Sequence, residues 1–163
     1  MTLAVLFLLY IVAQRLVELV IARRNTAALI AQGAREHFPR HYPLIVLVHG
    51  GWIAAMIVLG WNTPVHLGWL AVYALIQVLR VWTLASIGRR WTTRILTLPN
   101  ETLVAKGPYR FLPHPNYMVV IAEILVAPLV LGLPLVAAVF SALNAAVLVI
   151  RVSAEERALQ RDI

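Results

Sequence analysis

The chain has 163 residues, of which 61% are hydrophobic and 13% are charged, and its mean hydropathy is +0.83. Soluble domains carry about 25% charged residues, so this composition excludes a large water-soluble core and indicates one membrane domain. The net charge of +7 forms no basic stripe with interleaved aromatic residues, which argues against nucleic acid, and the lack of cysteine excludes disulfides, thiolate nucleophiles and Cys-ligated zinc.

Five continuous apolar segments predict an all-α integral membrane bundle of about five helices, not the alternating strands of a β-barrel. They are Leu3–Ala22, Tyr42–Gly60, Leu67–Ile87, Tyr117–Leu131 and Leu133–Ile150. The first begins with no basic region and no small-residue cleavage site, so we expect a retained helix and not a signal peptide. The last two are short and joined by "LGLP", in which Gly followed by Pro predicts a tight helical hairpin.

Basic residues alternate between the connections and predict the orientation. Residues 23–41 contain Arg23, Arg24, Arg35 and Arg40, residues 88–116 contain five Lys or Arg, and residues 61–66 contain none. The positive-inside rule then places the N-terminus outside and the C-terminus in the cytoplasm, which agrees with five crossings.

Four charged residues fall inside the apolar segments, where a charge costs about 2.5–3.5 kcal/mol on insertion scales. Arg15 and Glu18 are three residues apart on one helix face and can pair. Arg80 and Glu123 have no local partner, so they either pair between the third and fourth helices or line a polar pocket.

The sequence "VHGGW" places His49 before Gly50 and Gly51 in the second apolar segment. A packed, hydrogen-bonded histidine is the simpler interpretation, and a ligand is the alternative. The glycines permit close approach of another helix.

The polar stretch "KGPYRFLPHPNY", residues 106–117, interrupts this apolar pattern. Gly107-Pro108 predicts a turn, and Pro115 predicts a helix start with His114 as a candidate cap. This start delivers His114, Asn116 and Tyr117 to the cytoplasmic end of the fourth helix. The alternative is an interfacial loop in which Lys106 and Arg110 meet lipid phosphates.

The tail "RVSAEERAL", residues 151–159, continues the fifth helix, with Arg151 and Glu155 on one face and Glu156 beside them. It is either a solvated helix end or part of a site. The predicted hairpin returns it to His114 and Tyr117, so we expect one cavity for a ligand with positive and negative groups.

Together, "GPYRFLPHPNY" and "RVSAEERAL" resemble the isoprenylcysteine carboxyl methyltransferase family and its phospholipid-methyltransferase relatives, from about Trp91 to Leu159. The resemblance implies a membrane methyltransferase that uses S-adenosylmethionine, with residues 1–87 as three N-terminal helices and residues 88–163 as the cofactor-binding core of a single domain. Pro113 stands where the family usually has Arg, and Val119 where many members have Gly. The segments "RLVELVIARRN", "GAREHFPRHYP" and "WTTRI" are also similar to a bacterial branch that O-methylates polyketide lipids such as alkylpyrones, which implies a bacterial inner membrane.

The resemblance also implies roles for individual residues. Arg151 would orient the acceptor oxygen and, with Glu155, form the catalytic pair. Independently of the resemblance, we expect Arg80, Glu123 and His49, which lie within apolar segments, to line the substrate route. The residues implied to contact S-adenosylmethionine are Tyr109, Arg110, His114, Pro115, Asn116, Tyr117, Glu155 and Glu156. The expected partners are a lipophilic or prenylated acceptor and membrane lipids; we expect no metal.

Alternative functions remain at this point. A phospholipid amine is a second acceptor class. A small transporter would show internal repeats, which the sequence lacks, and a non-catalytic scaffold would not need the His114 and Glu155 groups.

Overall fold

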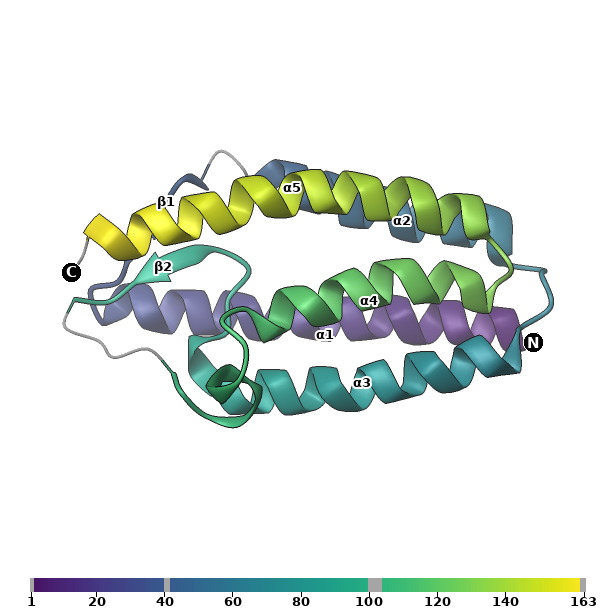
Figure 1. Cartoon of the computed structure of the whole chain (residues 1–163), viewed down its shortest axis with the longest axis horizontal. Coiled ribbons are helices and arrows are strands. Elements are labelled where there is room, and N and C mark those ends of the chain that lie inside the picture. The colour runs from purple at the N-terminus through teal and green to yellow at the C-terminus, as the bar shows by residue number, and fades with distance from the viewer. Residues whose placement is uncertain (1, 40–41, 100–103, 162–163) are drawn as a thin grey trace.

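Five α-helices run back and forth along one axis in the computed structural model, which describes residues 2–39, 42–99 and 104–161, with backbone only for 159–161 (Figure 1). They are α1 (Leu3–Ala31), α2 (Tyr42–Gly60), α3 (Leu67–Ile87), α4 (Pro115–Val130) and α5 (Pro134–Arg161). The N-terminus lies at one end of the bundle and the C-terminus at the other (Figure 1). The predicted all-α membrane bundle is confirmed.

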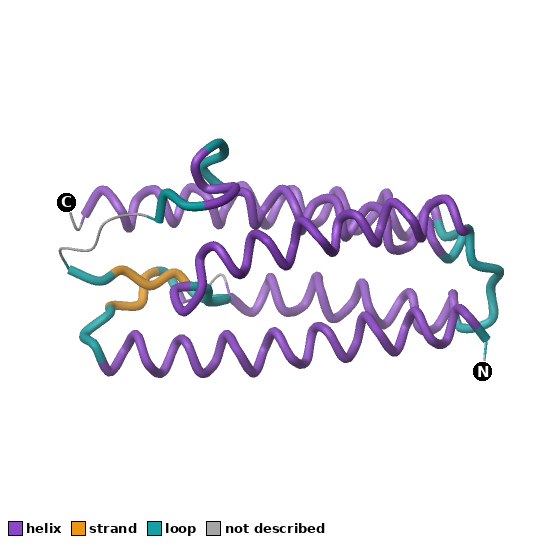
Figure 2. The backbone as a smooth tube through the Cα atoms, turned by 90° about the horizontal axis from the view of Figure 1, so that it is seen from below, coloured by secondary structure: helices purple, strands orange, loops and turns teal. Residues whose placement is uncertain are grey.

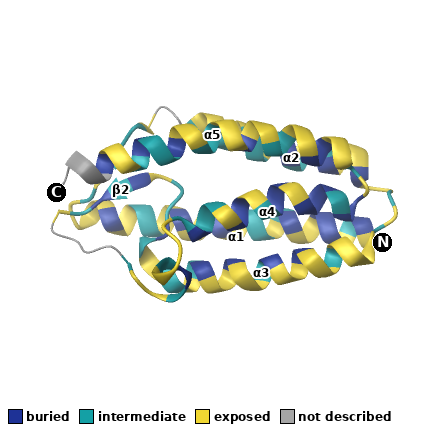
Figure 3. Ribbon diagram, viewed as in Figure 1, coloured by how far each residue is buried: buried dark blue, intermediate teal, exposed yellow. Residues whose placement is uncertain are grey.

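Four helices are long and apolar enough to cross a bilayer, namely α1, α2, α3 and α5. Helix α4 has 16 residues and rises about 24 Å, less than the ~30 Å hydrocarbon core. Exposed residues lie along the outer faces of the helices (Figure 3). Many of them are large and apolar, among them Leu47 and Val58. Such a surface requires lipid, so the protein is a membrane protein.

Helix α1 extends nine residues beyond the predicted end at Ala22. Residues 23–31 contain neither Gly nor Pro, so nothing stops the helix before Gly33, whose φ of +93° is incompatible with a helix. Arg23 and Arg24 therefore belong to α1 and not to a connection, which corrects the prediction. Arg40 and His41 lie outside the described residues.

Two short strands, which the sequence did not predict, lie at the same end as the C-terminus (Figure 2). β1 (Arg35–His37) pairs antiparallel with β2 (Ile95–Thr97), with Arg35 opposite Thr97. Ile95 packs with Ala154 and Ala158 of α5. The strands thus connect the two polar connections to the end of α5.

The hairpin of α4 and α5 is confirmed. Gly132, with φ +68°, follows α4, and Pro134 begins α5. Helix α4 packs against α3 and α5, and Ile124 and Ala127 have no exposed surface. In α2, a Cβ on Gly51 would lie 3.4 Å from the Phe140 ring of α5, which is the close approach expected of this glycine.

Candidate active site

Two arginines and two glutamates form a buried quartet between α1, α3 and α4. Arg80 donates through Nη1 to Glu123 at 2.7 Å and through Nη2 to Glu18 at 2.6 Å. Arg15 donates to the same two carboxylates, at 3.0 Å to Glu18 and 2.7 Å to Glu123. Both predicted pairs, Arg15–Glu18 and Arg80–Glu123, are confirmed, and the pairing across α1 is an addition that the sequence did not reveal.

The second polar cluster joins α4 to α5 through Tyr117. Its hydroxyl donates to Glu155 and accepts from Nε of Arg151 at 2.9 Å. Its ring stacks on His114 with 5.3 Å between centroids. Arg151 also donates from Nη1 to the carbonyl of Thr93 at 2.9 Å. The structure therefore brings the segment around residue 114 and the tail together, as the hairpin predicted.

The remaining residues expected at the cofactor lie around this cluster. Pro115 begins α4 with His114 at the N-cap, although the imidazole makes no capping bond. Tyr109, in the turn Gly107–Arg110, is half-buried; burial and the nearby Glu155 charge raise its pKa to about 12. Arg110 and Glu156 are exposed.

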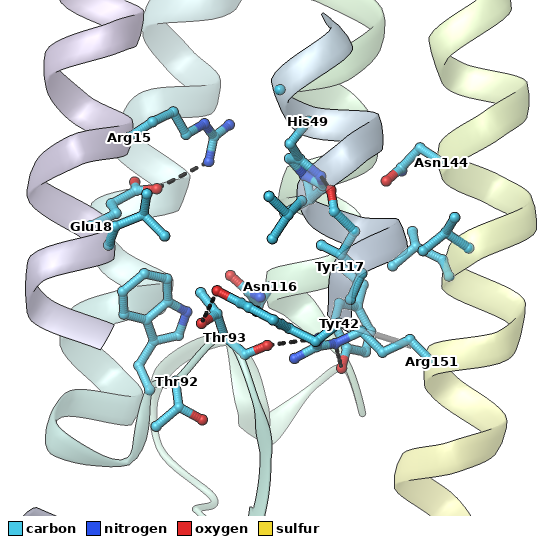
Figure 4. A pocket seen from close by; sticks show the side chains of 18 of the residues that line it. Arg15, Glu18, Tyr42, His49, Thr92, Thr93, Asn116, Tyr117, Asn144 and Arg151 are labelled. Carbon is cyan, nitrogen blue, oxygen red and sulfur yellow. Dashed lines mark hydrogen bonds and ion pairs between the residues drawn. The ribbon is translucent and has the colours of Figure 1, made fainter. Parts of the chain in front are cut away.

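A cavity of about 250 Å³ lies between α1, α2, α4 and α5 beside both polar clusters (Figure 4). Of the expected cofactor and catalytic residues, Asn116, Tyr117 and Arg151 line it; of the expected route, Arg80 and His49 do. Six of the expected cofactor and catalytic residues lie outside its lining: Tyr109, Arg110, His114, Pro115, Glu155 and Glu156.

The other departures from expectation concern Glu123 and Val119. Glu123 has no exposed surface and does not line the cavity; it is held by Arg15, Arg80 and Gln77. Val119, which stands where many family members have Gly, belongs to the apolar core and also lies outside the lining.

His49 makes the packed contact expected of it. Its Nδ1 lies 2.9 Å from the carbonyl oxygen of Ile45, one turn earlier in α2. Since a carbonyl oxygen only accepts, Nδ1 carries the hydrogen of this bond. The imidazole also lines the cavity, so the two interpretations of this residue are compatible.

Sequence reasoning missed several cavity residues. Tyr42 and Thr93 line it and their hydroxyls lie 3.3 Å apart. Trp91 lines it with a buried indole Nε1 that has no hydrogen-bond partner in the described part of the chain, and its carbonyl accepts from Asn25 at 2.8 Å. Asn144 lines it at 2% exposure. The sequence could have indicated Asn144, because an amide in the fifth apolar segment is costly to bury without a hydrogen-bond partner.

Comparison with known proteins identifies the family. A protein named Uncharacterized protein YpbQ, from Bacillus subtilis (strain 168), is 40% identical over 160 residues, 95% of each chain. A Haemophilus influenzae protein, named Uncharacterized protein, is 26% identical over 156 residues, 91% of this chain and 90% of its own. No solved structure matches this chain. The model of the isoprenylcysteine carboxyl methyltransferase (ICMT) family matches residues 69–161, more than half of the sequence. The chain therefore belongs to the isoprenylcysteine carboxyl methyltransferase family of membrane methyltransferases.

Proposed function

We propose that the protein uses S-adenosylmethionine to methylate a carboxylate or acidic hydroxyl of a lipophilic acceptor. The observation that carries this proposal is the position of Tyr117 and Arg151. Both residues line the cavity. Tyr117 also contacts His114 and Glu155, which lie outside the cavity lining. The two residues thus form a partition between an interior space for the acceptor and an outer group of polar side chains for the cofactor.

The outer residues fit the cofactor's charges. Glu155 and Glu156 suit its ammonium group or ribose hydroxyls, and Arg110 suits its carboxylate. Asn116, which lines the cavity, adds a buried Oδ1 that no described residue satisfies, which is an acceptor available to a ligand N–H or O–H. We place the cofactor at the outer polar side chains, with Asn116 at the boundary, and the acceptor inside the cavity.

The bound cofactor supplies an electrophilic methyl group on a sulfonium. An in-line displacement needs the acceptor oxygen held at about 3–3.5 Å from that carbon. Arg151 is 9% exposed, and the orientation of its guanidinium is fixed by Tyr117 and the Thr93 carbonyl. A cation held in this way would orient an anionic oxygen, which needs no general base, and the apolar walls would exclude water.

N-methylation of a phospholipid amine is less well supported. The amine would have to lose a proton before it could attack, and the Arg151 cation at the cavity wall would repel its protonated form. The same cation attracts a carboxylate or enolate. The charge of the cavity therefore favours an oxygen acceptor.

We further propose that the end carrying β1 and β2 faces the cytoplasm, with the N-terminus outside, in a bacterial inner membrane. Arg94, Lys106 and Arg110 belong to the connection at that end, whereas the α2–α3 connection, residues 61–66, has no Lys or Arg. The positive-inside rule supports this orientation. It would give a water-soluble cofactor access to Glu155 and His114.

The test is calorimetric titration of S-adenosylmethionine into detergent-solubilised protein. We expect binding that Glu155→Gln weakens at least tenfold, while the matched variant Glu36→Gln, in the partly buried strand β1, leaves affinity unchanged. Membrane lipid extract incubated with methyl-labelled cofactor should then yield a labelled methyl ester or ether by mass spectrometry. Folded protein that does not bind the cofactor contradicts the proposal and favours a transporter or scaffold.

A further inference from the structure

The cavity has a polar group at each end and apolar walls between them. On α2, Tyr42 and His49 both line it, and Ile45 and Val46 lie between them. On α5, Arg151 and Asn144 both line it, with Leu148 and Val147 between. Each pair is seven residues apart, a rise of about 10 Å. Two antiparallel helices thus repeat the same polar, apolar, polar order.

The end near Arg151 is the proposed site of methyl transfer, and the opposite, deep end has hydrogen-bonding capacity of its own. Figure 4 shows Arg15, His49 and Asn144 together at the end away from Arg151. Arg15 lines this end with a buried Nε–H that lacks a partner in the described part of the protein. Asn144 adds an amide, and in neutral His49 the Nε2 atom is an acceptor, since Nδ1 donates to Ile45.

The deep end has no net charge to offer a ligand. Arg15 and Arg80 are balanced by Glu18 and Glu123 within hydrogen-bonding distance. An ionised group placed there would lose its hydration without gaining a counter-charge. A neutral hydroxyl or carbonyl can accept from Arg15 or Asn144 at much lower cost.

We propose that the acceptor carries two oxygen functions, one methylated beside Arg151 and a second, uncharged one bound at the deep end by Arg15, His49 and Asn144. This assignment rests on the proposed function for the first oxygen and on the cavity alone for the second. A cavity of about 150 Å³ holds benzene, so 250 Å³ accommodates a ring with substituents at opposite ends. A purely aliphatic segment would leave the deep polar groups unpaired, and the site would discriminate against it.

Binding of two small probes to solubilised protein tests this assignment without requiring turnover. 2-Pentylhydroquinone and 2-pentylphenol differ by one hydroxyl, opposite to the first. We expect the hydroquinone to bind wild type about tenfold more tightly, the contribution of one or two buried hydrogen bonds. Asn144→Leu and His49→Leu, which replace a polar side chain by an apolar one, should each reduce this preference to below about threefold.

Leu148→Met is the matched control, because it conserves volume in the apolar wall and should change the affinity of both probes alike. The two probes partition differently into detergent, but this difference is the same for every variant, so it cancels when the preferences of the variants are compared. Arg15 is left intact, since its loss would leave two buried carboxylates with only the cation of Arg80. The proposal would be overturned by any of three results: equal binding of the two probes to wild type, no binding of either probe, or a preference that is retained in both Asn144→Leu and His49→Leu. Loss of S-adenosylmethionine binding or of methyl transfer tests the proposed function separately.

Discussion

Tyr117 donates its phenolic hydrogen to the carboxylate of Glu155, which lies 38 residues further along the chain. Tyr117 is in the first turn of α4 and Glu155 is near the end of α5, so the bond closes the open end of the helical hairpin. The same oxygen accepts from Arg151 at 2.9 Å. One hydroxyl therefore holds a cation and a carboxylate in fixed relation.

Tyr117→Phe should lower kcat/KM by about 10- to 100-fold. It removes the hydroxyl that bridges two charged groups but keeps the ring that stacks on His114; the loss of one hydrogen bond to a charged group, about 1.5–3 kcal/mol, corresponds to a decrease of this size. The measurement is methyl transfer from labelled cofactor into lipid extract. Tyr73→Phe is the control: Tyr73 is 2% exposed and its hydroxyl has no partner within the described residues, so activity should be unchanged and melting temperature equal or higher. Similar losses in both variants would contradict the bridging role.

Gly107→Ala should destabilise the protein more than Gly33→Ala. Both glycines have positive φ, so each alanine costs about 1–2 kcal/mol in backbone strain. At Gly107 the added Cβ would also lie 2.1 Å from Oγ of Ser86 in α3, whereas Gly33 faces open space. We expect an extra loss of about 1–3 kcal/mol at Gly107, measured by thermal unfolding in detergent. Equal effects would show that this turn does not dock tightly on α3.

Arg80→Gln should cost about 3–5 kcal/mol of unfolding free energy, because it leaves two buried carboxylates to share the single cation of Arg15. The matched change Arg94→Gln affects a pair with Glu36 that is 40% and 24% exposed, together with a contact on the Tyr42 ring, and should cost at most about 1–2 kcal/mol. Denaturant unfolding of the solubilised protein measures both.

The double variant Arg80→Gln, Glu123→Gln restores charge balance and should be more stable than Arg80→Gln alone. It also separates folding from the proposed substrate route. A folded double variant with normal turnover would exclude Arg80 and Glu123 from that route, and a folded variant with lost turnover would support it.

Tyr109 should ionise with a midpoint near pH 12, compared with about 10 in the unfolded chain. Since the folded-state pKa is raised, the native protein keeps this proton longer, and the resulting stabilisation is complete below pH 10 and lost as the pH rises towards 12. Absorbance near 295 nm, recorded as wild type minus Tyr109→Phe, isolates this titration. Removal of the Glu155 charge by Glu155→Gln should lower the midpoint, and an unchanged midpoint would contradict their proximity.

The sequence was sufficient for the helices and for the return of the tail to His114. Continuous apolar runs, Gly132 and Pro134 each have a local physical meaning, so the hairpin could be predicted. The pairing of Arg80 with Glu123 was one of two interpretations that the sequence left open, since a charge at membrane depth requires a counter-charge or a polar pocket.

Other features depend on tertiary contacts that no local pattern encodes. β1 and β2 have three residues each, too few for a period, and their pairing joins positions 60 residues apart. The links from Arg80 to Glu18 and from Arg151 to the Thr93 carbonyl require the relative rotation of helices and the path of a loop. The presence of a polar group at each end of the cavity could not be predicted either, because it depends on which faces of α2 and α5 meet.

The ion pair between Arg15 and Glu18 bears on how the chain enters the bilayer. These two residues are three apart on α1, so their opposite charges neutralise each other before any later helix has been made. Arg80 is synthesised 43 residues before Glu123, so until Glu123 has been made the counter-charge available to Arg80 is Glu18 of the first helix. The first helix to enter the membrane thus carries a neutral ion pair that can bind the charged side chains of the third and fourth helices as they follow.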